Sequence, residues 1–147
     1  MVLGKGSPVM TGLRKLATGP ALLQIGAGRV AVQPVHVDDL ARVIADIVLA
    51  ADALPEIIEI GGREVLEMRE LLRRVRFHAR GRRGPVVRIP VNLLRFVVAS
   101  LEPLAQSRLP VSAGQLASFV NDGTAQPAEY IRVRQPEFHS VEAMIAA

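Results

Sequence analysis

The stretch Val32-Gln-Pro-Val-His-Val-Asp-Asp-Leu-Ala41 and the apolar residues after it decide the fold. Its first residues complete a predicted strand over Arg29–Val35. The apolar residues that follow recur at i, i+3 and i+4 spacing: Leu40, Val43, Ile44, Ile47, Val48 and Ala51. This spacing predicts a helix that packs through one face. We expect Asp38 to cap the helix and Asp39 to place negative charge in its first turn, where the helix dipole favours it.

Strand and helix patterns alternate on both sides of this stretch. Upstream we expect a strand end at Met1–Gly4, a helix over Met10–Thr18 and a strand over Ala21–Ile25, joined to Arg29–Val35 by a tight hairpin-like turn at Gly26–Gly28. Downstream we expect a strand over Glu56–Ile60, a helix from about Leu66 to Ala79, a strand over Val86–Ile89, and helices over Val91–Leu101, Ser112–Val120 and after Ser140. With 147 residues, the pattern predicts one α/β domain.

The second of these helices shows its packing face most clearly. Its apolar positions predict a buried side made of Met68, Leu71, Leu72 and Val75. On the other side, Glu70 lies one turn before Arg74, a spacing at which opposite charges attract.

The composition excludes several classes of protein. There is no cysteine, which rules out disulfides, thiol catalysis and thiolate metal sites and fits a reducing compartment. We expect no signal peptide, because the first residues have no charged leader followed by an apolar stretch. The longest apolar stretch, Val91–Leu104, is interrupted by polar residues and falls short of the roughly 20 residues that span a bilayer. We therefore expect a cytoplasmic protein without a membrane span.

The net charge of +4 comes mostly from arginine, which accounts for 16 of the 18 basic residues. The densest cluster consists of Arg73, Arg74, Arg76, Arg80, Arg82 and Arg83. Such a cluster is either a footprint for phosphates or a solvated helix face with a loop after it. We favour the solvated face. Aromatic residues make up 3% of the chain and no nucleic-acid motif accompanies the charge, so no nucleic-acid partner is expected.

Several segments resemble the extended and atypical short-chain dehydrogenases/reductases. The stretch Val32–Ala41 is similar to that family's V-Q-P-V-H-V-D-D segment. Glu59–Leu72 is similar to the strand–glycine–helix unit that follows it, and Val86–Pro90 and Leu116–Asp122 match later landmarks in the same order. The resemblance is nearest to the NAD-dependent epimerase/dehydratase-like branch that includes an accessory subunit of respiratory complex I. It implies a partial Rossmann-like sheet with a small helical substrate lobe. Relatives have Thr or Ser as a helix cap where this chain has Glu67, so we expect that helix to start less firmly.

Two features of that family are missing from the sequence. Its glycine-rich turn lets a helix N-terminus meet the cofactor pyrophosphate, whereas Gly26-Ala-Gly-Arg-Val-Ala31 lacks the third glycine and leads into a strand. Its active-site Tyr and Lys are separated by three residues, but Tyr130 has Arg134 at that spacing. We therefore expect no catalytic residues and no cofactor-binding residues in this chain.

The resemblance leaves Gln33 and His36 as substrate-side candidates, because the family's His-containing strand end borders the substrate cleft. The alternative for His36 is a structural histidine whose ring hydrogen-bonds a nearby loop. Asp38 and Asp39 are adjacent carboxylates, and capping explains them better than acid/base or metal chemistry. His78 and His139 are isolated, and no spacing of His, Asp or Glu predicts a metal site.

The resemblance implies that residues 1–147 are the C-terminal, substrate-side portion of such an enzyme, without the N-terminal dinucleotide-binding half. We expect a truncated or split oxidoreductase or epimerase that is inactive alone and holds no cofactor, whereas the parent family uses NAD(P). Whether the chain is itself an enzyme stays open. The alternative is a non-catalytic interaction or assembly module. The expected partner is an N-terminal Rossmann half, or another copy of the chain through self-association.

Overall fold

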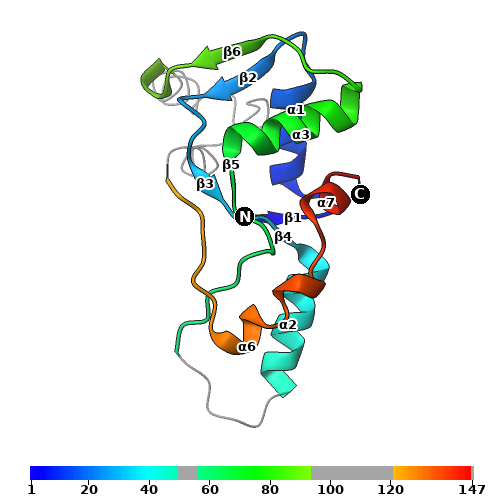
Figure 1. Cartoon of the computed structure of the whole chain (residues 1–147), viewed down its shortest axis with the longest axis vertical. Coiled ribbons are helices and arrows are strands. Elements are labelled where there is room, and N and C mark those ends of the chain that lie inside the picture. Colours follow the sequence, from blue (N-terminus) through cyan, green and yellow to red (C-terminus); the bar gives the residue numbers. More distant parts are fainter. Residues whose placement is uncertain (50–55, 94–120, 147) are drawn as a thin grey trace, which may run out of the picture.

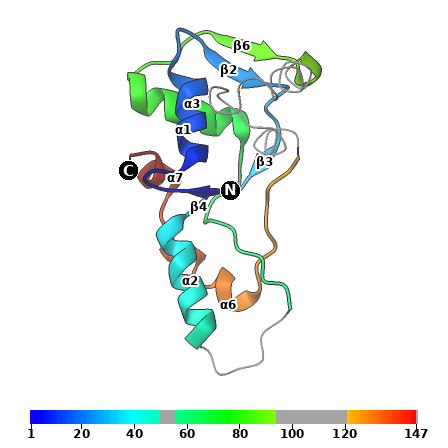
Figure 2. The same cartoon turned by 180° about the vertical axis from the view of Figure 1, so that it is seen from behind.

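The computed structural model describes residues 1–49, 56–93 and 121–146, which form an elongated α/β molecule (Figure 1). Its elements are β1 Val2–Leu3, α1 Pro8–Thr18, β2 Leu22–Ile25, β3 Ala31–Val32, β4 Val35–His36, α2 Val37–Leu49, β5 Leu66–Glu67, α3 Met68–Arg80, β6 Val86–Ile89, α6 Glu129–Arg132, the 3-10 helix η1 Gln135–Glu137 and α7 Val141–Ala146. The upper part holds α1, α3, β2 and β6, the lower part holds α2 and α6, and β1 and β4 lie between them (Figures 1 and 2).

The described strands form three separate two-stranded sheets. β1 pairs with β4 and β2 pairs with β6, both in parallel, and β3 pairs with β5 in antiparallel. The mixed α/β class is therefore confirmed, and the partial Rossmann-like sheet stays a prediction. The strand at Val86–Ile89 has the expected bounds. The helix predicted over Val91–Leu101 begins at residue 91, and its residues from 94 onward, like the whole Ser112–Val120 helix, lie outside the described residues.

The hairpin expected at Gly26–Gly28 is wrong. Both glycines adopt left-handed φ angles of 60° and 63°, and the Gln24 amide closes the turn by donating to the carbonyl of Ala27 at 2.9 Å. The chain then turns toward the start of α3, where the Arg69 N–H donates to the Gly28 carbonyl at 2.9 Å. The turn therefore points away from β2, which leaves β2 to pair with β6.

The strand expected over Glu56–Ile60 is also wrong, because this segment pairs with no strand among the described residues. It packs through alternate side chains. Ile58 and Ile60 lie against the lower core cluster while Ile57 is exposed. This alternation imitates the pattern of a strand, but a strand also needs a neighbouring backbone to bond with.

Two core clusters hold the molecule together. The upper cluster joins α1, α3, β2 and α7, and it contains all four residues predicted to be buried on α3: Met68, Leu71, Leu72 and Val75. The lower cluster is smaller and contains Val35, Val43, Ile131 and Phe138. On α2 the predicted packing face is only partly used, since Val43 is buried but Ile44 and Val48 are 49% and 75% exposed.

The arginine cluster is not one solvated face, as we had expected, because Arg76 is buried. Its guanidinium donates to the carbonyls of Ala17, Gly19 and Pro20 at 2.7, 3.1 and 3.2 Å. These carbonyls lie at and just after the end of α1, where helix geometry leaves carbonyl groups without partners. Arg80 likewise donates to the Thr18 carbonyl. The two arginines therefore fasten the C-terminal end of α1 to α3.

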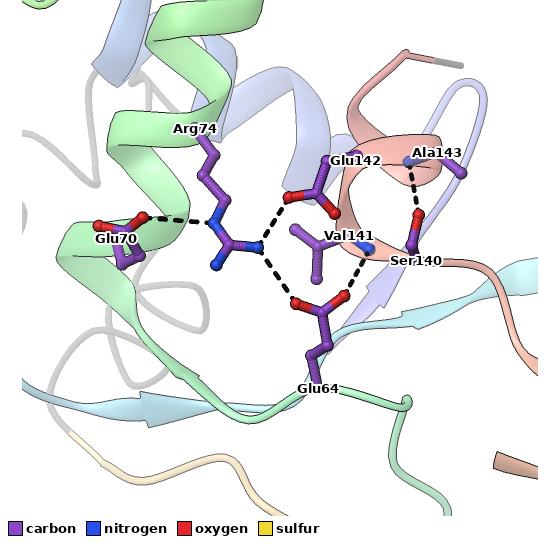
Figure 3. Close-up of polar contacts among 7 residues, drawn as sticks. All are labelled: Glu64, Glu70, Arg74, Ser140, Val141, Glu142 and Ala143. Atoms are coloured by element: carbon purple, nitrogen blue, oxygen red, sulfur yellow. Dashed lines mark hydrogen bonds and ion pairs between the residues drawn. The ribbon is translucent and has the colours of Figure 1, made fainter. Parts of the chain in front are cut away.

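Arg74 lies at the centre of a second network, which holds α7 (Figure 3). Its guanidinium contacts the carboxylates of Glu70, as predicted, and also those of Glu64 and Glu142, at 3.3, 3.1 and 2.8 Å. Burial acts to lower the pKa of Arg74, but the hydrogen bonds to Glu64 and Glu70 and the charge of Glu142 outweigh it and raise the pKa. Arg74 therefore stays charged and joins three segments.

The predictions for the starts of α7 and α3 are confirmed. The Ser140 hydroxyl accepts the Ala143 N–H at 3.2 Å, which confirms it as the cap of α7. Glu67 precedes α3 without capping it through its side chain. None of the helices in the described segments is long and apolar enough to cross a membrane.

Gly62 fits against the Pro34 backbone so closely that a Cβ there would overlap the Pro34 carbonyl oxygen. We predict that Gly62→Ala lowers the free energy of unfolding by about 3 kcal/mol, because neither backbone can move without disturbing the β3–β4 segment. Urea unfolding followed by far-UV circular dichroism measures this. Gly123→Ala is the matched control, since a Cβ at Gly123 meets nothing within 4 Å. Equal stability of the two variants would contradict the packing described.

Candidate functional site

The candidate site lies at the carboxyl ends of β1 and β4. Because these strands are parallel, their ends meet at one edge, and α1 and α2 begin there. A cavity of about 370 Å³ occupies this edge, lined by residues 2–9 and by Val37. A second hollow of about 210 Å³ shares the loop after β1 and reaches Thr11 and Arg14. In α/β proteins this is the edge at which ligands bind.

The loop Gly4-Lys5-Gly6-Ser7 shapes both hollows. A Cβ at Gly4 would lie 2.6 Å from the Val37 side chain, so only glycine lets the loop lie against the start of α2. Gly6 has a φ of 77°, a left-handed conformation that glycine adopts without strain. Ser7 then caps α1 by accepting the Met10 N–H at 3.4 Å. The sequence predicted no site at this loop, although two glycines stand between a strand end and a helix that begins with proline.

The electrostatics of this edge favour an anionic or strongly polarised group. The N-terminal ends of α1 and α2 both lie at the cavity. Asp38 and Asp39 offset the partial positive charge of α2, whereas the first turn of α1 holds no acidic residue and keeps its partial positive charge. Lys5 adds a full charge from the loop. The end of α1 and Lys5 therefore suit the acceptor atoms of a bound group. Tyr130 lies on α6 in the lower part of the molecule, where it cannot form a proton donor with Lys5.

His36 stands directly behind this edge. Its ring is buried, and Nδ1 accepts the Asp38 N–H at 3.2 Å. The ring stacks on His139 with centroids 4.3 Å apart. Asp38 was expected to cap α2, but the helix begins at Val37. The His36 ring caps it instead, by accepting the hydrogen bond from the Asp38 N–H. His36 thus supports the start of α2 beside the cavity, and a direct role toward substrate stays a prediction.

Asp39 is a buried carboxylate that makes long-range contacts. Its side chain is fully inaccessible and accepts two hydrogen bonds from His139, from the backbone N–H at 2.8 Å and from ring Nδ1 at 2.9 Å. Arg42 also contacts it. Asp39 lies in the first turn of α2, as predicted, and the prediction that His139 is isolated is wrong. The local sequence carried no signal for a pair so far apart in the chain.

Gln33 is buried, and both ends of its amide are occupied. Its Nε2 donates to the Gly62 carbonyl at 2.7 Å, and its Oε1 accepts the Ala125 N–H at 3.0 Å. The side chain fills the space beside Gly61, where a Cβ would overlap it. Gln33 thus joins its own strand segment to the backbone at Gly62 and at Ala125, whereas His36 contacts the start of α2. Its role toward substrate also stays a prediction.

Neither a metal centre nor a catalytic carboxylate pair emerges from this geometry. Across residues 1–49, 56–93 and 121–146, no three His, Asp or Glu side chains gather as a metal site would require. The adjacent carboxylates of Asp38 and Asp39 point to different surroundings, since one is exposed and the other fully buried.

The chain is distantly homologous to a reductase. It is 30% identical over 124 residues to divinyl chlorophyllide a 8-vinyl-reductase, chloroplastic, of Arabidopsis thaliana. The match covers 81% of this chain but 28% of that protein, so the chain spans less than a third of its relative. No family model matches the sequence. The resemblance to a reductase family is supported to this extent, and the short-chain dehydrogenase/reductase assignment stays a prediction.

We predict that Asp39→Asn lowers the free energy of unfolding by about 2 kcal/mol, because the amide cannot replace the charged acceptor shared by His139 and Arg42. Asp46→Asn is the control. Its exposed ion pair with Arg134 should contribute less than about 1 kcal/mol. Thermal or urea unfolding at pH 7 compares them. If both variants lose the same stability, Asp39 does not hold the C-terminal segment.

Proposed function

We propose that these 147 residues form the substrate-side portion of an NAD(P)-dependent reductase of the extended short-chain type. In this proposal hydride transfer needs a dinucleotide-binding half that these residues do not include, and β1 and β4 belong to a larger Rossmann-like sheet. The observation that carries the proposal is the 30% identity to a reductase, which extends over most of this chain but a small part of the relative. The proposal keeps the cytoplasmic location expected from the sequence.

The geometry of the site supports a binding role. The cavity lies at the carboxyl ends of two parallel strands, and the Gly4–Ser7 loop brings backbone close to it. In an α/β reductase this edge faces the substrate, and the cofactor lies at the same edge of the neighbouring strands. Among the described strands β1 pairs only with β4, so its other side offers backbone groups with which a further strand can pair.

The residues of this chain support the need for a separate dinucleotide-binding half. The turn at Gly26–Gly28 is filled by the side chain of Gln24 and continues into β3, whereas a pyrophosphate cradle needs an open turn that starts a helix. Reduction also needs a proton donor of the phenol–ammonium kind, and neither Lys5 nor Lys15 has a tyrosine at the family's spacing. NAD(P) would supply the hydride when bound to the other half.

Calorimetric titration of the chain with NADPH, and separately with NADH, tests this proposal. We expect no saturable heat at cofactor concentrations up to the millimolar range, because neither glycine turn completes the family's pyrophosphate cradle. Gln24 fills the turn at Gly26–Gly28, and the loop at Gly4 and Gly6 has Val9 where the pattern needs its third glycine. Saturable one-to-one binding of either dinucleotide would contradict the proposal.

The alternative function, a non-catalytic assembly module, is favoured by one observation. Apolar side chains are exposed along α2 and at the strand edges, among them Val48 at 75%, Leu49 at 83% and Val87 at 48%. Apolar surface of this kind promotes association with a partner or with another copy of the chain.

We predict that an assembling chain shows a mass in light scattering that rises with concentration, and that Ile44→Ser together with Val48→Ser suppresses the rise by removing apolar area from α2. Arg132→Ser, at an exposed site on α6, is the control. A monomer at every concentration would count against the assembly function.

A further inference from the structure

A separate cavity of about 500 Å³ lies between α3 and the starts of β2 and β6. It is at the amino ends of these strands, whereas the candidate site is at the carboxyl ends of β1 and β4. Its walls include apolar side chains from the two strands and a set of charged and aromatic side chains: Glu70, Arg73, Arg74, Arg76, Phe77 and Arg83. A volume of this size is within the range of small-molecule pockets.

The positive charge of this cavity is not balanced by the described residues. The lining itself holds four arginines and one glutamate, Glu70. The three glutamates that contact Arg74 are all engaged with that residue, whereas Arg76 is 4% exposed and its partners are all backbone carbonyls. In residues 1–49, 56–93 and 121–146, no carboxylate forms an ion pair with Arg73, Arg76 or Arg83, and the buried Arg76 Nε has no hydrogen-bond partner. A buried charge without a counter-ion is costly, so an anion in the cavity would relieve this cost.

The other residues that line the cavity indicate which kind of anion fits it. Phe77 is 60% exposed beside the arginines, and it offers an aromatic face to a flat apolar group. Guanidinium groups match the paired oxygens of carboxylates and phosphates. A nucleic acid would need a basic track along the surface, whereas this feature is one concave pocket.

We propose that this cavity binds a small aromatic anion, a carboxylate or a phosphate. The anionic group lies between Arg73 and Arg83, within the field of Arg76, and the ring lies against Phe77. The site is independent of the proposed substrate edge, so it can be occupied whether or not the chain takes part in a reductase.

Calorimetry with the 147-residue chain tests this site using 2-naphthoate, 2-naphthyl phosphate and the neutral analogue 2-naphthamide. The first two probes separate carboxylate from phosphate recognition. We expect saturable binding of at least one anion, at least about tenfold tighter than the amide, because a hydrogen bond to a charged group is worth more than 1.4 kcal/mol. Arg73→Gln and Arg83→Gln should each weaken the anion about tenfold.

Arg88→Gln is the matched control, since Arg88 is exposed on β6 and does not line the cavity. It should bind the anion as the unmodified chain does. Three results would each overturn the proposal. The amide and the anions could bind equally, all three arginine variants could lose the same affinity, or neither anion could bind. A mixed-sequence RNA 20-mer that binds while both naphthyl anions do not would also overturn it, in favour of a nucleic-acid surface. Circular dichroism confirms that each variant is folded.

Discussion

The buried guanidinium of Arg76 fixes the position of α1 relative to α3. One side chain from α3 satisfies three carbonyls at and after the end of α1, where helix geometry leaves them without partners. The chain beyond α3 is placed by the same group, because Gly84 lies against the guanidinium with no room for a side chain. The opposite end of α1 forms the wall of the candidate site. The site's geometry therefore depends on a contact made at the far end of that helix.

Buried and half-buried charges perform the same task elsewhere in the molecule. Asp39 ties α2 to the segment before α7, and Arg74 joins α3, α7 and the residues that precede β5. The described sheets each have only two strands of two to four residues, and such sheets are marginal by themselves. Polar contacts between distant segments, together with the upper apolar cluster, therefore hold the elements in place. The same need for compensation explains why a cavity beside Arg76 is expected to take an anion.

Local patterns in the sequence predicted local structure well. The buried face of α3, the bounds of β6 and the Ser140 cap of α7 all follow from spacing or from a side chain close by in the chain. Contacts between segments far apart in the chain were not predictable in this way. The turn at Gly26–Gly28 read as a hairpin because the contact that redirects it comes from Arg69, and the Asp39–His139 pair has no local signature. For the site, the sequence identified the strand end at His36 but not the Gly4–Ser7 loop that shapes the cavity.

A buried arginine thus sets the position of the proposed binding edge. Hydrogen exchange of Arg76→Met, compared with the unmodified chain, tests this most directly. Local opening raises the exchange rate of the amides that it frees. The account predicts exchange about tenfold faster or more in the last turn of α1 and at Leu22, whose N–H bonds the Pro85 carbonyl, with little change in α2. Unchanged exchange at the end of α1 would contradict it.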